Sequence, residues 1–127
     1  MANEITITFN LRWSRGGGSV SGSISDTVNQ TGNAAFESIQ TIGSTTEQIV
    51  LGDVSGSKHL MLQNRDATDT IHIDKVTPVV PGSGTAIKLI PGSNFKGGHT
   101  YMLTAQDTWY AISSANTPDL LVVAIEE

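Results

Sequence analysis

The chain has 127 residues, near the commonest size of a single domain, and no cysteine, which excludes disulfides, thiolate zinc sites and cysteine nucleophiles. Seven basic and twelve acidic residues give a formal net charge of −5. This balance argues against a nucleic-acid partner, because phosphate binding needs clustered lysine and arginine. We expect no membrane partner either, because the N-terminus lacks the pattern of a secretory signal and the longest apolar run, residues 120–125, is too short to span a bilayer.

The N-terminal segment has the most regular strand pattern in the sequence. Apolar and polar residues alternate from residue 5 to residue 13, and the apolar positions are Ile5, Ile7, Phe9, Leu11 and Trp13. Because successive side chains of a strand leave on opposite faces, we predict a strand that is anchored in a sheet, with Trp13 on its buried face. Three glycines at positions 16–18 should end this strand.

Residues 19–43 have the weakest pattern. Val20 and Ile24 would face inward on a weak strand, and residues 26–33 are polar and predict a loop. Residues 34–42 fit either a strand or a single helical turn. The threonine and isoleucine content favours the strand.

The remaining sequence is a series of short apolar runs separated by turn residues. Ile71 and Ile73 share one face of a predicted strand, with His72 and Asp74 on the other. The last run is apolar on both faces, which predicts a strand covered from two sides. Seven strands are predicted in this part of the chain, at residues 48–51, 59–62, 70–74, 86–90, 100–103, 109–112 and 120–125.

These patterns predict an all-β protein, either an antiparallel β-sandwich or a jelly-roll-like barrel of about eight or nine short strands. We treat residues 1–127 as a single β-domain. Within it, residues 14–46 form a Gly/Ser-rich, loop-containing segment that could serve as a contact arm.

Two groups of polar residues are candidates for a metal site. His72 and Asp74 could support a metal or an acid–base pair, but zinc usually takes three or four ligands, so an ordinary polar surface is favoured. Asn64, Asp66 and Asp69 could offer oxygens to calcium, but the glycine and glutamate of an EF-hand loop are missing, and Asx turns explain them more simply. We therefore predict no catalytic residue, no cofactor and no metal, and hence a protein that is not an enzyme.

Several stretches of the chain resemble small virion structural proteins of tailed bacteriophages, of the capsid decoration (cement) type. The similar stretches are the opening MANEITIT, then IGSTTE at 42–47, LGDV at 51–54, LQNRDATD at 62–69 and the acidic ending IEE. Apart from the opening, the similarity covers about the last two-thirds of the chain, and it consists of turn and strand residues, so no active-site residue is implied.

The resemblance implies a partner and a location. The chain would bind the major capsid protein on the capsid exterior of a virion, after synthesis in the host cytoplasm, and would associate with itself as a homotrimer that matches a three-fold lattice position. An exposed ring of the Trp109–Tyr110 pair is more often an oligomer contact than a ligand site. The predicted capsid or oligomer contacts are Arg12, Arg15, Phe36, Trp109 and Tyr110. The alternatives are a tail, neck or fibre component, or a carbohydrate-binding β-sandwich module.

Overall fold

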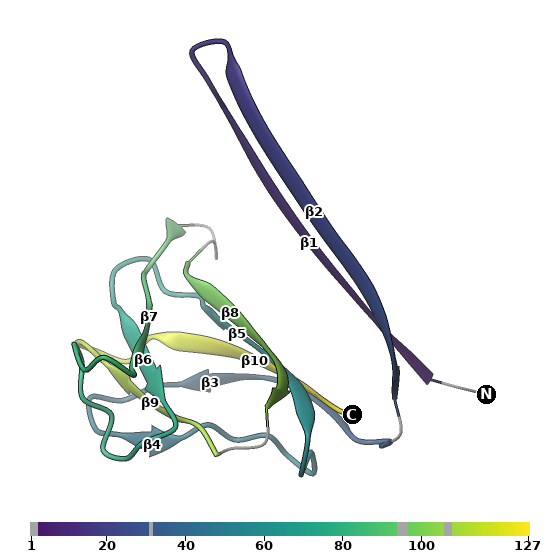
Figure 1. Ribbon diagram of the computed structural model, residues 1–127. Coiled ribbons are helices and arrows are strands. Elements are labelled where there is room, and N and C mark those ends of the chain that lie inside the picture. The colour runs from purple at the N-terminus through teal and green to yellow at the C-terminus, as the bar shows by residue number, and fades with distance from the viewer. Residues whose placement is uncertain (1–2, 31, 94–96, 106–107) are drawn as a thin grey trace. The chain divides into compact units, whose positions relative to one another are not determined.

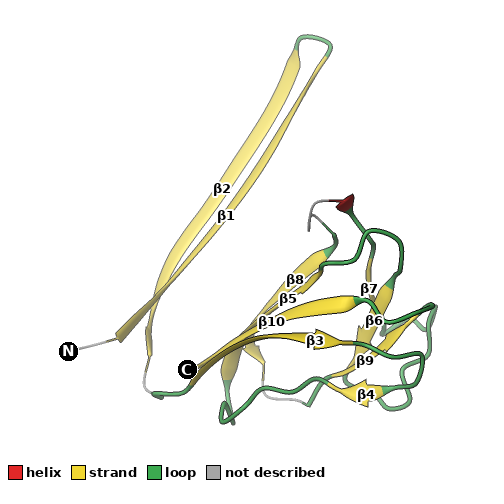
Figure 2. Cartoon of the chain, turned by 180° about the vertical axis from the view of Figure 1, so that it is seen from behind, coloured by secondary structure: helices red, strands yellow, loops and turns green. Residues whose placement is uncertain are grey.

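The computed structural model describes residues 3–30, 32–93, 97–105 and 108–127. These residues form ten β-strands, connected by loops, and no α-helix (Figure 2). Every strand pair is antiparallel. The predicted all-β, antiparallel class is therefore confirmed.

The chain divides into two compact units, residues 1–32 and 33–127. The division falls inside the segment 14–46, so the predicted contact arm includes parts of both units. Each unit has its own sheet structure, and they are described separately below.

The first unit is a long β-hairpin of two 13-residue strands, β1 (Asn3–Arg15) and β2 (Gly18–Gln30). The strands pair without a register shift from the base of the hairpin to its turn. Gly16 and Gly17 connect them with φ angles of 59° and 82°, as a two-residue type I′ turn requires. The glycines that end the first strand therefore also fix the register of the second. Residues 26–30 belong to β2, so the prediction of a loop at residues 26–33 is wrong for these five residues.

The second unit contains eight strands in two four-stranded sheets, with the orders β3-β10-β5-β8 and β4-β9-β6-β7 (Figure 1). Their bounds are β3 (Ala35–Thr41), β4 (Glu47–Gln48), β5 (Lys58–Asn64), β6 (Ile71–Asp74), β7 (Ile87–Leu89), β8 (His99–Ala105), β9 (Tyr110–Ser113) and β10 (Asp119–Glu126).

The pairing of these eight strands is nested. The outermost pair is β3 with β10, followed inward by β4 with β9, β5 with β8, and β6 with β7. Two further pairs, β5 with β10 and β6 with β9, join the nested pairs into the two sheets. This order is that of a double-sheet jelly roll, which is itself a β-sandwich of two sheets, so this unit agrees with the predicted class of an antiparallel β-sandwich or jelly-roll-like fold.

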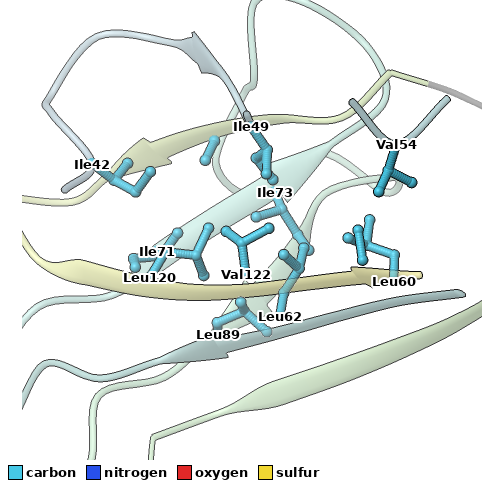
Figure 3. Close-up of a cluster of buried hydrophobic side chains, with 12 residues drawn as sticks. Ile42, Ile49, Val54, Leu60, Leu62, Ile71, Ile73, Leu89, Leu120 and Val122 are labelled. Atoms are coloured by element: carbon cyan, nitrogen blue, oxygen red, sulfur yellow. The ribbon is translucent and has the colours of Figure 1, made fainter. Parts of the chain in front are cut away.

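The core of the jelly roll lies between the two sheets. Figure 3 shows Leu60, Leu62 and Val122 from one sheet close to Ile71 and Ile73 from the other. In β10, the inward residues 120, 122 and 124 are buried, whereas the alternate residues 121, 123 and 125 are only partly buried. The prediction that this strand is covered from both sides is therefore wrong for its outer face. The buried core consists of Ile42, Ile49, Val54, Leu60, Leu62, Ile71, Ile73, Leu89, Ala111, Leu120, Val122 and Ala124.

Candidate interaction surface

The hairpin has two faces of opposite character. Its register pairs each odd-numbered residue of β1 with an even-numbered residue of β2, and directly paired residues share a face. We call the face with odd β1 residues the apolar face: it carries Ile5, Ile7, Phe9, Leu11, Trp13, Val20, Ile24 and Val28, together with Gly18, Gly22, Asp26 and Arg15. The other, the polar face, carries Thr6, Thr8, Asn10, Arg12, Ser14, Ser19, Ser21, Ser23, Ser25 and Thr27.

Large side chains in the turn half of the apolar face are exposed, whereas Ile5 near its base is buried and Ile7 and Val28 are partly buried. The exposed fraction is 73% for Leu11, 69% for Ile24, 63% for Val20, 51% for Trp13 and 41% for Phe9. The prediction that Trp13 lies in a core is therefore wrong. The alternation correctly identified the apolar side of the strand, but a two-stranded ribbon has no second layer of its own to cover that side.

Two of the predicted contact residues, Arg12 and Arg15, lie in this hairpin. Arg12 is exposed on the polar face, where it pairs with Ser21. Arg15 is exposed in the last pair before the turn, opposite Gly18. The structure therefore places both guanidinium-bearing residues in the turn half of the hairpin, and their contacts with a partner remain a prediction.

The other three predicted contact residues belong to the jelly roll. Phe36 is half-buried, packs against the core and covers Gly52, whose φ is 58°; a Cβ at residue 52 would collide with the Phe36 ring. Trp109 also packs against the core, and its carbonyl oxygen accepts a 2.9 Å hydrogen bond from the Ile49 amide. Tyr110 is half-buried at the start of β9. The jelly roll itself therefore buries part of each of these three aromatic side chains.

The turn after β5 is built by side chains that bond their own backbone. The Asn64 Oδ1 accepts from the Asp66 amide at 2.9 Å, and the Asp66 Oδ1 accepts from the amides of Thr68 and Asp69, both at 2.7 Å. Hydrogen bonds from the Asp69 and Thr68 amides lower the pKa of Asp66, because they stabilise its charged form. The Asx-turn interpretation of this segment is confirmed.

Asn64 also has a role that the sequence did not reveal. Its side chain is fully buried, and its Nδ2 donates to the carbonyl oxygens of Asp69 at 2.8 Å and Leu89 at 2.9 Å. Leu89 is the last residue of β7, in the opposite sheet. One amide side chain therefore connects the end of β5, the following turn and the other sheet.

The His72–Asp74 pair is divided between two environments. Asp74 is buried and accepts a 2.6 Å hydrogen bond from Thr85 Oγ1, which is the main cause that lowers the pKa of Asp74. His72 is half-buried and pairs with Lys88 of β7. Burial, and then the positive charge of Lys88, lowers the pKa of His72. Asp74 thus supports the loop after β6 from a buried position, so the prediction of an ordinary polar surface is wrong for Asp74.

A pocket of about 290 Å³ lies on the jelly roll, beside the buried residue Lys58. The Lys58 ammonium donates to the carbonyl oxygens of Gly56 at 2.6 Å and Ala105 at 3.2 Å, and so holds the start of β5 to the end of β8. Nothing in the sequence indicates that this lysine is buried, since Lys58 precedes a short apolar run like several others in the chain. Its neighbours around the pocket are Gln48, Ile49, Leu51, Gly52, Val54, Ser55, Gly56 and Thr108.

Among the residues that the structure describes, no three histidine, aspartate or glutamate residues gather as metal ligands would, and no helix is long and apolar enough to cross a membrane. Comparison of the chain with family models, with curated proteins and with solved structures finds no match. The exposed apolar face of the hairpin is therefore the strongest candidate for a functional surface.

Proposed function

We propose that the protein is a non-enzymatic virion structural protein, a capsid decoration protein that binds the outer face of the capsid shell and stabilises it. The observation that carries the proposal is the combination of a packed jelly roll with a long hairpin, 13 residues in each strand, that exposes large apolar side chains on one face and hydroxyl-bearing side chains with Arg12 on the other. A patch of this kind commonly marks a surface for protein contacts. The similarity of the turn sequences to phage virion proteins supports the choice of partner.

The two units suit different parts of this task. The jelly roll has a closely packed core and antiparallel sheets, so it can act as a stiff body that keeps its shape on a crowded shell. The hairpin gives a contact surface longer than most strands in globular proteins. Contacts spread over several shell subunits become tight when an oligomer engages them together, which is why we propose a homotrimer.

We assign the shell contact to the polar face and the turn of the hairpin. Hydroxyl-bearing side chains line this face, and Arg12 adds a guanidinium group that can bind a carboxylate with paired hydrogen bonds. Residues 9–24 of the hairpin include Arg12 and Arg15 and no acidic residue, so the turn half of the hairpin has a positive formal charge, opposite in sign to the −5 of the whole protein.

Shell melting tests the proposal. Virions that carry the protein are stripped of it, remixed with the purified chain and heated in a calorimeter. We expect the melting temperature of the shell to rise on addition of the chain and to rise less with the Arg12→Ser variant. The control Lys88→Ser removes an exposed positive charge from the jelly roll and should behave as the wild type. Unchanged melting with the wild-type chain, or recovery of the chain with tails in place of heads, would overturn the proposal.

A further inference from the structure

In the turn half of the apolar face, residues 7–15 and 18–26, the side chains repeat symmetrically about one cross-strand pair. This pair is Leu11 with Gly22. On either side stands a pair of one aromatic and one β-branched residue: Phe9 with Ile24 towards the base, and Trp13 with Val20 towards the turn. In both flanking pairs the aromatic residue lies on β1 and the β-branched residue on β2.

Two charged residues of this face lie at equal distances on either side of the Leu11–Gly22 pair, and their charges have opposite signs. The next pair towards the base is Ile7 with Asp26, and the next pair towards the turn is Arg15 with Gly18. Asp26 and Arg15 thus lie in pairs equally distant from the Leu11–Gly22 pair, one negative and one positive. A surface with this pattern is complementary to itself when one copy is turned end for end.

We propose that the apolar face binds the apolar face of a second copy of this chain, with the two hairpins antiparallel and the two-fold axis at the Leu11–Gly22 pair. In this arrangement β1 lies over β1 of the other copy, Phe9 lies over Trp13, and the pair that contains Asp26 lies opposite the pair that contains Arg15. The two Leu11 side chains meet at the axis. Each has room beside it, since a Cβ at Gly22 would meet nothing within 4 Å.

The area of overlap indicates a weak, reversible dimer. With the axis at residue 11, residues 7–15 of the two β1 strands lie over each other, and nine residues at about 3.4 Å per residue on two strands about 4.8 Å apart give a footprint of about 300 Å² per copy. A stable interface buries about 800 Å² on each partner, so two such ribbons, packed about 10 Å apart as a two-layer sandwich, should associate only at high protein concentration. A second copy is also the one partner present wherever the chain is synthesised.

This inference goes beyond shell binding and does not depend on it. The apolar face is used between copies of the chain, while the polar face and the turn stay open to the shell. If the chain is also a trimer, each hairpin pair joins two neighbouring trimers. The test uses the purified full chain without shells, so that its failure and the failure of the proposed function are distinguishable.

Because the chain has no cysteine, single cysteines can report the pairing. The variant Leu11→Cys, treated with a short bis-maleimide, should form a cross-linked dimer, whereas Asn10→Cys on the polar face should not. Phe9→Cys and Trp13→Cys should each cross-link weakly alone and strongly when the two are mixed, because antiparallel hairpins bring residue 9 of one copy over residue 13 of the other. Equal cross-linking of Leu11→Cys and Asn10→Cys would overturn the inference, as would stronger cross-linking of residue 9 to itself than to residue 13.

A charge exchange tests the polar part of the arrangement. Asp26→Arg alone and Arg15→Asp alone each place like charges opposite each other and should weaken self-association at least several-fold in analytical ultracentrifugation. The double variant Asp26→Arg/Arg15→Asp should recover it. Thr8→Asp adds a charge to the polar face and should leave self-association unchanged. A double variant that associates no better than the single ones, or a Thr8→Asp variant that dissociates as they do, would refute the antiparallel face-to-face pairing.

Discussion

Replacement of Asn64 by alanine should destabilise the jelly roll more than replacement of any one exposed residue by alanine. The Asn64 side chain has no exposed surface and makes three hydrogen bonds, with the backbone of Asp66, Asp69 and Leu89. Alanine removes all three at once. The carbonyl groups of residues 69 and 89 then lose the donor that the buried amide provides.

The magnitude follows from what is left without a partner. Each buried acceptor that loses its donor costs about 1–3 kcal/mol, and the bond to the half-buried Asp66 amide adds about 0.5–1.5 kcal/mol. The expected loss is about 2.5–7.5 kcal/mol of the free energy of unfolding. Domains of this kind have about 5–15 kcal/mol in total, so the variant should be strongly destabilised. With a urea m-value of about 1–3 kcal/mol/M, even the lower figure moves the midpoint by about 0.8 M or more.

Urea unfolding of the jelly roll measures this loss. The chain has two tryptophans, so a Trp13→Phe background leaves Trp109, which packs against the core, as the single fluorescent reporter. In that background Asn64→Ala should lower the midpoint and Asn10→Ala, in the exposed face of the hairpin, should not. Asn64→Asp should be the least stable at neutral pH, because it places a carboxylate against two carbonyl oxygens. An aspartate variant as stable as the wild type would refute the assignment of the Nδ2 group as donor to both carbonyls.

Two further predictions concern backbone packing and pH. Gly97→Ala should unfold at a markedly lower urea concentration than the wild type, because its Cβ would collide with the Asn64 carbonyl oxygen, whereas Gly84→Ala, in open space, should leave the midpoint unchanged or slightly raised. Because the folded pKa of His72 lies below its ordinary 6.5, stability should fall as pH drops from about 6.5 towards that lower value, and His72→Gln should flatten this part of a pH series of urea midpoints. Lys88→Gln should weaken the dependence without removing it, since burial is the larger cause; an unchanged pH profile in His72→Gln would contradict the assignment.

Strands that contribute to the jelly-roll core were predictable because burial imposes a period of two. Ile71 and Ile73 are fully buried, with His72 half-buried between them, as their alternation predicts. The glycine and proline turns also placed the strands from residue 58 onward to within a few residues of their observed bounds. Local sequence thus determines which segments are strands and which side of each is apolar.

Strand order was not predictable from the same information. The outermost pair joins β3 to β10, so residue 41 pairs with residue 119. Such a pair is determined by the packing of the whole unit and not by any turn between its strands. The buried contacts of Asn64 with Leu89 and of Lys58 with Ala105 are consequences of this order, which is why the sequence showed the Asx turn but neither contact.

The hairpin shows a different limit of sequence reasoning. Its first strand has a clear alternating pattern, yet Leu11 and Trp13 are more than half exposed. Alternation shows only that one side of a strand avoids water; it does not show whether the covering layer belongs to the same chain. The second strand was harder to predict, since serine and glycine fill six of its 13 positions and only Val20, Ile24 and Val28 keep the apolar period. A pattern that is regular over nine residues and unmatched by a second layer in its own unit is what a surface selected for contact between molecules should look like.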